Sequence, residues 1–468
     1  MFLGVALGMA WSRADGGRAS PDNEVQGSIT SSTSEPDSTR QTVETPSISG
    51  LDRPSVAPPT GPSRSYVVAG VHVNEGADSN PSGTLGGSSE FSSTTGVWGS
   101  VGLVKLRRRF ETFIDYVAGG TFYSGYNGSG NDQHLQQLSA DQRVLWRRGR
   151  LTLRDSFSKL VGGNFGMRVF GGTNAQNLRF AAVGTGIPAS TGASDFFGAS
   201  QLGDRGQESY LTNVAEADVT EALTPRSAVS FAGAYSFTDY SGIGINSRQT
   251  SVQGGYNYQL DRRNAIGVLY GFRIFQFPLS YIGNVTANSA QLVYQHRVSG
   301  RMDLVLGAGP ELARVHDVIR GNTQEINATV NAALRYRLKK ASLDISYRRL
   351  VTSGSGFFAG GNSDVVRFSV ARDIFRSWQT AFDAGYARIR SLQPSSNRVG
   401  EEAYQYGFAG VAIRRRFGRR FGTSASYEFS DGQLNSVCSS SPSCPGSVGR
   451  RHIALIGFDW YIRPILLE

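Results

Sequence analysis

The chain of 468 residues lacks the long apolar run that a membrane-spanning helix needs. Such a helix takes roughly 20 consecutive apolar residues, and no stretch of this sequence is that long. An α-helical membrane protein is therefore excluded. Hydrophobic residues make up only 39% of the chain and the mean hydropathy is −0.26. A β-barrel needs apolar residues on one face only, so it can span a membrane with a hydrophilic average.

Lysine is also scarce, since only positions 105, 159, 339 and 340 carry it, although Lys and Arg together number 47 and the net charge is +10. Arginine thus supplies nearly all of the positive charge. A basic balance can attract nucleic acid. The arginines, however, are not gathered on a helix or a tail; they recur at the ends of expected strands and at alternate positions within them. This distribution is typical of a barrel lining and its membrane edges, so we expect no nucleic-acid partner.

Cysteine occurs only twice, at Cys438 and Cys444, in one loop rich in Ser, Pro and Gly. So close a pair predicts a local disulfide in an oxidising compartment, with free thiols as the alternative. A zinc site would need more ligands, and the five histidines, at positions 72, 134, 296, 316 and 452, are scattered singly. We expect neither a metal nor a cofactor.

Catalytic motifs are missing as well. The sequence contains no Gly-x-Ser-x-Gly elbow and no pair of histidines at metal-binding spacing. We therefore expect a protein that is not an enzyme. A serine and a histidine need to be adjacent only in space to react, so a pair of this kind at the membrane edge is the one catalytic alternative.

The N-terminal part differs from the rest. Residues 2–9 are apolar and end in a small-x-small pattern, without a preceding Lys or Arg, which predicts a truncated signal peptide over residues 1–14. Residues 15–64 are rich in Ser, Thr and Pro with almost no aromatics. Such a segment buries too little apolar surface to offset its chain entropy, so we predict a disordered periplasmic tail.

From Tyr66 onward, apolar and polar residues alternate with a period of two. The pattern is clearest from Glu325 to Arg337, where Ile326, Ala328 and Val330 and their successors oppose polar residues. This run of about thirteen residues is long enough to cross a membrane. A soluble sandwich rarely sustains such strands. We predict an all-β protein, a single antiparallel up-and-down transmembrane barrel over residues 65–468.

The turns support the same architecture. Tight basic or polar turns lie at residues 107–108, 147–149, 224–226, 261–263, 299–300, 339–340, 373–376 and 416–419, with longer Gly/Ser/Asn-rich loops between them. Short turns at one end and long loops at the other are typical of outer-membrane barrels. The count comes to about eighteen strands, with sixteen as the alternative.

In strand and turn pattern, the chain resembles the porin-like bacterial outer-membrane β-barrel superfamily. The resemblance implies a bacterial outer-membrane location, both termini in the periplasm, and contact with lipid, lipopolysaccharide and the assembly machinery, as a monomer or a trimer. Members usually end with an aromatic residue that this machinery reads. Here Phe458, Trp460 and Tyr461 are followed by residues 463–468, which is a departure from that pattern.

Charged residues at alternate strand positions are candidates for the lumen. The predicted arginines are Arg143, Arg154, Arg273, Arg301, Arg314, Arg335, Arg337, Arg348 and Arg367, and the predicted carboxylates are Asp115, Asp141, Asp303, Glu311, Asp344, Asp383 and Glu428. An excess of arginine would favour anions. The alternative is that arginine and carboxylate neutralise each other across neighbouring strands.

The longest loop, roughly residues 160–208, is expected to be the third outer loop. In general porins the third loop folds into the barrel and narrows it. Its charged residues, candidates for a constriction, are Arg168, Arg179, Asp195, Asp204 and Arg205. A surface loop without a transport role is the alternative.

These observations predict a channel for small hydrophilic solutes, with a preference for anions as one hypothesis, because about eighteen strands leave an aqueous lumen. Two alternatives stay open: a barrel that exports a polymer such as an exopolysaccharide, and a surface adhesion or structural barrel with a blocked lumen. The sequence does not identify a solute.

Overall fold

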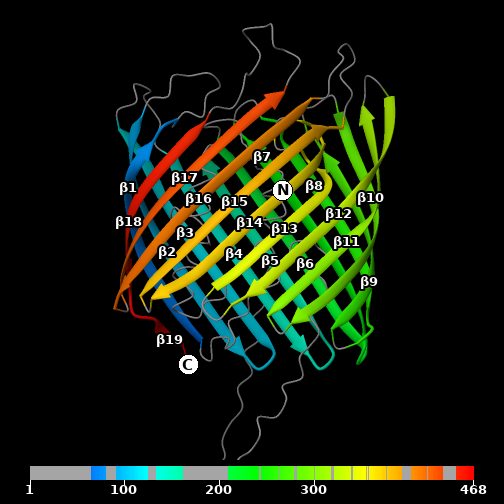
Figure 1. Ribbon diagram of the computed structural model, residues 1–468, viewed down its shortest axis with the longest axis horizontal. Helices are drawn as coiled ribbons and strands as arrows, with labels where there is room; N and C mark the ends of the chain where they lie inside the picture. The colour runs from blue at the N-terminus through cyan, green and yellow to red at the C-terminus, as the bar shows by residue number, and fades with distance from the viewer. Residues whose placement is uncertain are drawn as a thin grey trace, which may run out of the picture. The chain divides into compact units, whose positions relative to one another are not determined.

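Eighteen antiparallel strands of the computed structural model form one sheet that closes on itself as a barrel (Figure 1). The structure describes residues 65–80, 91–124, 133–161, 209–241, 244–261, 263–278, 282–299, 301–317, 321–338, 341–354, 356, 358–375, 377–392, 402–418, 420–435 and 450–467. Among these residues, no helix is long and apolar enough to cross a membrane. The predicted barrel is confirmed, with eighteen strands rather than sixteen. The predicted signal peptide and tail, residues 1–64, lie outside the described residues.

The barrel strands are 11 to 18 residues long, which is long for strands of globular proteins. A further strand of three residues, β19, follows them. In chain order the strands are β1 (Ser65–Asp78), β2 (Ser92–Arg107), β3 (Phe110–Ser124), β4 (Gln133–Trp146), β5 (Gly149–Val161), β6 (Ser209–Thr224), β7 (Ser227–Tyr240), β8 (Ser247–Gln259), β9 (Asn264–Gln276), β10 (Ile282–Ser299), β11 (Met302–Asp317), β12 (Gly321–Arg337), β13 (Ala341–Thr352), β14 (Gly361–Phe375), β15 (Trp378–Ser391), β16 (Ala403–Phe417), β17 (Phe421–Asn435), β18 (Arg451–Tyr461) and β19 (Ile465–Leu467).

Eight short connections join β2 to β3, β4 to β5 and so on to β16 and β17, and each coincides with a predicted turn. Asp261 shows how such a turn is held between β8 and β9. Its Oδ1 accepts hydrogen bonds from the backbone N–H groups of Arg263 and Asn264, at 2.6 and 2.8 Å, and its Oδ2 accepts one from the Asn264 side chain at 2.6 Å. These hydrogen bonds, above all the one from the Asn264 side chain, hold the pKa of the Asp261 carboxyl below its usual range. Asp is favoured in turns because its carboxylate can bond nearby backbone N–H groups.

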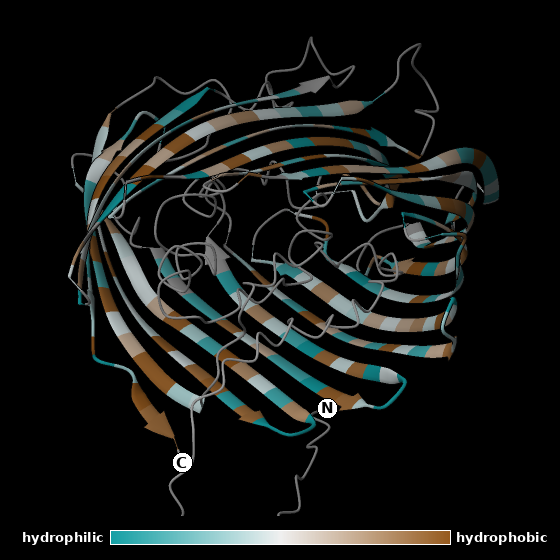
Figure 2. Ribbon diagram, turned by 60° about the horizontal axis from the view of Figure 1, so that its bottom comes forward, coloured by the Kyte–Doolittle hydropathy of each residue, from teal (hydrophilic) through white to brown (hydrophobic). Residues whose placement is uncertain are grey.

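The two faces of the sheet differ in polarity, as the period of two requires. Large apolar side chains such as Val268, Tyr270, Leu292 and Ile456 are exposed on the outer face. Figure 2 shows the resulting alternation of hydrophobic and hydrophilic residues along the strands. An exposed apolar face of this extent on a closed barrel is the surface that lipid covers.

The barrel closes where β1 pairs with β18, from Gly70 opposite Tyr461 to Asp78 opposite Ile453. Beyond Pro464, the chain resumes as β19, which pairs with Ser65 to Val67 of β1. The segment after the last aromatic residues therefore extends the closing seam. The start of β1 and the end of β18 lie at the end of the barrel that carries the short turns (Figure 1).

Candidate functional site

The inner face of the barrel is lined largely by polar and charged side chains, and ion pairs run across its strands. On β11, for example, Asp303, Gly307 and Glu311 share the inner face, whereas Leu306 is exposed on the outer one. A polar inner wall inside an apolar outer wall makes the lumen the natural candidate site of this protein.

Arg335 of β12 lies between two carboxylates of neighbouring strands. In the register of the sheet it is opposite Asp303 of β11 and Asp344 of β13. Its Nε donates to Asp344 Oδ1 at 2.9 Å, while Asp303 is also 3.3 Å from Nε of Arg297 on β10. Ionised partners make the stronger hydrogen bonds in proteins. The structure thus brings three of the predicted lumen residues into one network.

A second network joins β4, β5 and β6. Arg154 Nε is 3.5 Å from Asp141 Oδ2, and Arg154 Nη1 is 3.6 Å from Glu216 Oε2. Arg143 Nη2 reaches the same Asp141 oxygen at 3.3 Å. Glu216 was not among the predicted lumen residues, although it shares the inner face of β6 with Tyr210, Thr212 and Val214, at every second position. That alternation was the signal that could have identified it.

A deeply buried pair is formed by Arg273 of β9 and Glu311 of β11, whose exposed fractions are 3% and 0%. Both residues were predicted in the lumen, but their shared partner was not. Arg273 Nη1 donates to the backbone carbonyl of Val351 at 3.1 Å, and Glu311 Oε2 accepts from the backbone N–H of Val351 at 3.1 Å. Val351 belongs to β13, which is not a neighbour of either strand in the sheet. The ion pair therefore holds a segment that has entered the lumen.

A hydrogen-bonded chain crosses the closing seam. His72 Nε2 is 3.1 Å from Ser100 Oγ, His72 Nδ1 is 2.8 Å from Asp459 Oδ1, and Asp459 Oδ2 is 2.7 Å from Nη2 of Arg414. The order serine, histidine, aspartate is that of a hydrolytic triad. Here Ser100 and His72 are 4% and 5% exposed, and the Ser100 hydroxyl is also 3.5 Å from the Gly70 carbonyl oxygen. We interpret this series of hydrogen bonds as a polar network that joins β18, β1 and β2.

The remaining predicted residues have varied positions. Arg348 shares the inner face of β13 with Asp344. Arg301 is exposed in the short turn between β10 and β11. Arg314 is exposed on the outer face of β11, on the side of Leu306. The Arg337 side chain, the loop residues Arg168, Arg179, Asp195, Asp204 and Arg205, and the predicted disulfide of Cys438 and Cys444 lie outside the described residues.

Charges of both signs line the inner face, and many of them are paired across strands. Among the described side chains the carboxylates there are at least as numerous as the arginines. The arginines are Arg143, Arg150, Arg154, Arg273, Arg297, Arg335, Arg348, Arg367, Arg414 and Arg451, and the carboxylates are Asp78, Glu111, Asp115, Asp141, Glu216, Asp218, Asp303, Glu311, Asp317, Glu325, Asp344, Asp383, Glu428 and Asp459. Several pairs link strands that are neighbours in the sheet, such as Arg367 with Asp383 and Arg451 with Asp78.

Comparison with known proteins finds similarity in solved structures alone. No family model and no curated protein matches the chain. The FrpB iron transporter from Neisseria meningitidis (F5-1 variant) is 8% identical with a TM-score of 0.42, covering 86% of this chain and 83% of that one. The outer membrane protein OpdK from Pseudomonas aeruginosa is 8% identical with a TM-score of 0.39, covering 85% and 99%.

OccK2 (OpdF) from Pseudomonas aeruginosa, in complex with glucuronate, is 9% identical with a TM-score of 0.40, covering 87% of this chain and 99% of that one. At such low identities and TM-scores, these similarities carry no argument about what this chain binds. The assignment of the fold rests on the closed antiparallel barrel described above.

Proposed function

We propose that this protein is a channel of the bacterial outer membrane for small hydrophilic solutes. The observation that carries the proposal is a closed barrel of eighteen strands with a polar, ion-paired inner wall and an apolar outer wall. A barrel of about eight strands is filled by its own side chains, whereas one of about 16–18 strands leaves an aqueous channel.

The barrel topology supports a definite orientation. In outer-membrane barrels the short turns face the periplasm and the long loops face outward. The start of β1 and the end of β18 lie with the short turns. We therefore place both ends of the barrel in the periplasm, with lipid and lipopolysaccharide around the apolar face.

The pairing of opposite charges in the lumen supports a channel with little preference for ion sign. A ring of like charges sets selectivity in a narrow pore, but here the arginines alternate with carboxylates on neighbouring strands. A preference for anions would require arginines that the carboxylates do not offset. Small polar solutes, neutral or charged, are the substrate class that this wall suits.

Conductance in a planar lipid bilayer tests the proposal. Purified, refolded protein should produce discrete ion channels, and heat-denatured protein from the same preparation should not. Liposomes that contain the protein should swell in small sugars and should swell more slowly as the sugar becomes larger. Refolded protein that stays electrically silent and does not admit sugars would contradict the proposal.

One observation favours a second candidate, a surface or structural barrel with a blocked lumen. Apolar side chains, among them Trp98, Tyr210, Phe275 and Tyr404, are fully buried on the inner wall. Side chains of this size occupy part of the lumen. The same bilayer experiment separates the two candidates, because a blocked barrel conducts no ions.

A further inference from the structure

The connection between β13 and β14 departs from the barrel wall. β13 pairs with β12 only up to Arg349, which is opposite Val330. From that point toward the long loops, β12 continues to Gly321 alongside β11, while β13 continues to Thr352 alongside β14. The sheet is therefore split between β12 and β13 at the end that carries the long loops, and the tip of the β13–β14 hairpin is free to turn inward.

The first anchor of this tip is the buried pair of Arg273 and Glu311. Together the two side chains bond both backbone groups of Val351, as the neighbouring strand would have done in an unbroken sheet. An unpaired backbone group that is buried costs free energy, so this ion pair compensates for the lost pairing with β12. A charge pair buried on both sides needs further hydrogen bonds to be favourable, and Val351 supplies them.

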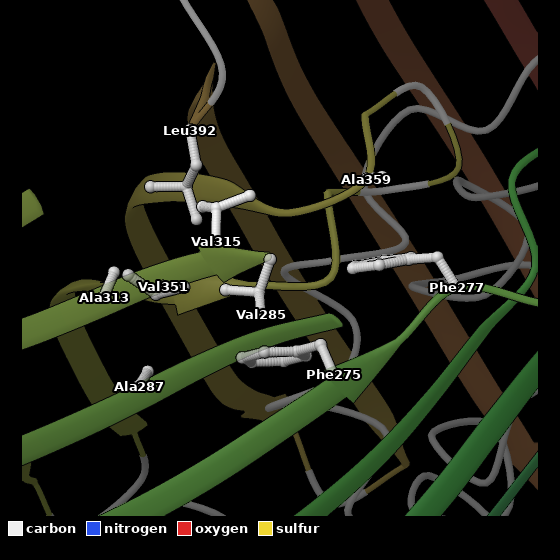
Figure 3. Packing of buried hydrophobic residues seen from close by; sticks show 9 residues of the cluster. All are labelled: Phe275, Phe277, Val285, Ala287, Ala313, Val315, Val351, Ala359 and Leu392. Carbon is white, nitrogen blue, oxygen red and sulfur yellow. The ribbon is translucent and has the colours of Figure 1, made fainter. Parts of the chain in front are cut away.

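Apolar packing provides two further anchors, on two different parts of the wall. Val351 and Ala359 pack with residues of β9, β10 and β11 and with Leu392 (Figure 3). The members of this cluster are Phe275, Phe277, Val285, Ala287, Ala313, Val315, Val351, Ala359 and Leu392. Phe358 packs on the inner side of β15 and β16, with Ala387, Ile389, Tyr404, Tyr406, Phe408 and Ala412.

The tip also reaches the connection between β7 and β8. The backbone N–H of Ile245 donates to the carbonyl of Gly356 at 3.0 Å, and a Cβ added at Gly356 would come within 2.8 Å of the Tyr240 ring. Gly354, Gly356 and Gly360 all have positive φ, between 74° and 92°, a backbone conformation that residues other than glycine rarely adopt. The described part of this tip therefore spans the inner side of the barrel from β15 and β16 to β7 and β8.

Internal bonds keep the tip in one conformation. The N–H of Phe358 donates to the Gly354 carbonyl at 3.1 Å, and that of Gly360 donates to the Ser353 carbonyl at 3.2 Å. A connection held by its own hydrogen bonds, by two apolar clusters and by an ion pair is a fixed part of the lumen.

We infer that the β13–β14 tip, made of Ser353, Gly354, Gly356 and Phe358 to Gly360, is the constriction of the lumen, and that Arg273 and Glu311 latch it in place. The inference rests on the proposed channel function and names the element that limits the passage of solutes. Arg273 and Glu311 are positioning residues, since they act through the backbone of Val351.

The test removes the hydrogen bonds of the latch but keeps side chains of similar size. In the variant Arg273→Met/Glu311→Leu neither side chain can bond the backbone of Val351. The comparison variant, Arg335→Met/Asp344→Leu, removes charges of the same two signs from a lumen pair on β12 and β13. We expect the single-channel conductance to rise several-fold in the latch variant. The comparison variant measures the effect of lost wall charges alone and should give a smaller change. The shift of each barrel on unheated gels verifies that it has folded.

A second readout does not depend on conductance. In a Cys438→Ser/Cys444→Ser background, Phe358→Cys places a thiol at a buried position of the tip. A maleimide should label it slowly when the latch is intact and much faster in the latch variant. Unlatching that accelerates labelling supports the latch. If the conductance then stays unchanged, the tip is latched but is not the constriction.

The outcomes separate this inference from the proposed function. If the native protein conducts and the latch variant matches it in both conductance and labelling, the latch is overturned and the channel stands. If neither protein conducts, the channel function fails and the constriction fails with it. If only the latch variant conducts, this tip closes the native barrel, so the constriction stands and the proposed channel function of the native protein fails.

Discussion

At the scale of the residue, the close approach of two strands requires glycine at Gly309 of β11. A Cβ added there would lie 1.7 Å from the backbone oxygen of Ala290 on β10. The neighbouring Pro310 has no N–H to donate, and the pairing of β10 with β11 is interrupted between Ser289 and Leu292. Proline within a sheet is confined to such irregular places.

We therefore expect Gly309→Ala to destabilise the barrel by about 1–3 kcal/mol, as overpacking does. Gly307→Ala on the same strand is the matched control, because its added Cβ would meet no atom closer than 3.4 Å. Urea unfolding of both variants in lipid vesicles, followed by tryptophan fluorescence, measures the difference. Equal losses in the two variants would show that the close approach to Ala290 is relieved at no cost.

The pair of Arg273 and Glu311 leads to a prediction about stability. Glu311→Ala alone leaves a buried guanidinium without its carboxylate, and breaking a buried pair in this way typically costs about 3–5 kcal/mol. The double variant Arg273→Met/Glu311→Leu should lose much less, because no unpaired charge remains. The same unfolding experiment compares them, and a single variant as stable as the double one would contradict the burial of Arg273.

At the scale of the element, two adjacent residues of β10 point to opposite sides of the sheet, one to the lipid and one to the lumen. Leu292 lies near the middle of the strand on the outer face, with 57% of its surface exposed, and Gln291 points to the other side, where its amide donates to Thr329. An arginine on the lipid face near the bilayer midplane costs about 2–4 kcal/mol.

Leu292→Arg should therefore lower the free energy of unfolding by about that amount, whereas Gln291→Arg should have a small effect. Both variants are compared with the native protein by the same urea titration in vesicles. A larger loss for Gln291→Arg would mean that the outer and inner faces of β10 are reversed.

The short strand β19 makes a testable contribution to the closing seam. It pairs with only three residues of β1, whereas β18 pairs with β1 from Gly70 to Asp78. Deletion of residues 465–468 should leave a closed barrel with a slightly lower midpoint in heat-modifiability gels. Trp460→Ala, a change within β18, is a useful comparison for folding yield. Loss of the folded form on deletion would show that β19 is essential to assembly.

At the scale of the whole molecule, the pairing of inner arginines with carboxylates predicts weak selectivity. In a gradient of potassium chloride the reversal potential of the native channel should be close to zero. Asp303→Asn/Asp344→Asn removes the two carboxylates on either side of Arg335 and should shift the potential toward anion preference. A native channel that already strongly prefers anions would contradict the neutralisation of the arginines.

Much of the whole-molecule architecture was predictable because it depends on a local pattern. The alternation from Glu325 to Arg337 assigns one face to lipid and the other to the lumen, and the turns of about two residues set the strand order. Arg335 and Asp344 could be predicted together since a short turn makes their strands neighbours. Arg314 could not be placed correctly from its charge, because its parity on β11, shared with Leu306, decides its face.

The sequence by itself thus determined a transmembrane barrel with a polar interior, since a period of two is a property of residues adjacent in the chain. Only the tertiary structure decided what the lumen contains. Val351 meets Glu311 forty positions away and Arg273 seventy-eight positions away, on strands that do not pair with its own. That contact arises because the pairing of β13 with β12 ends at Arg349. The alternation of residues along the chain does not indicate where two neighbouring strands separate.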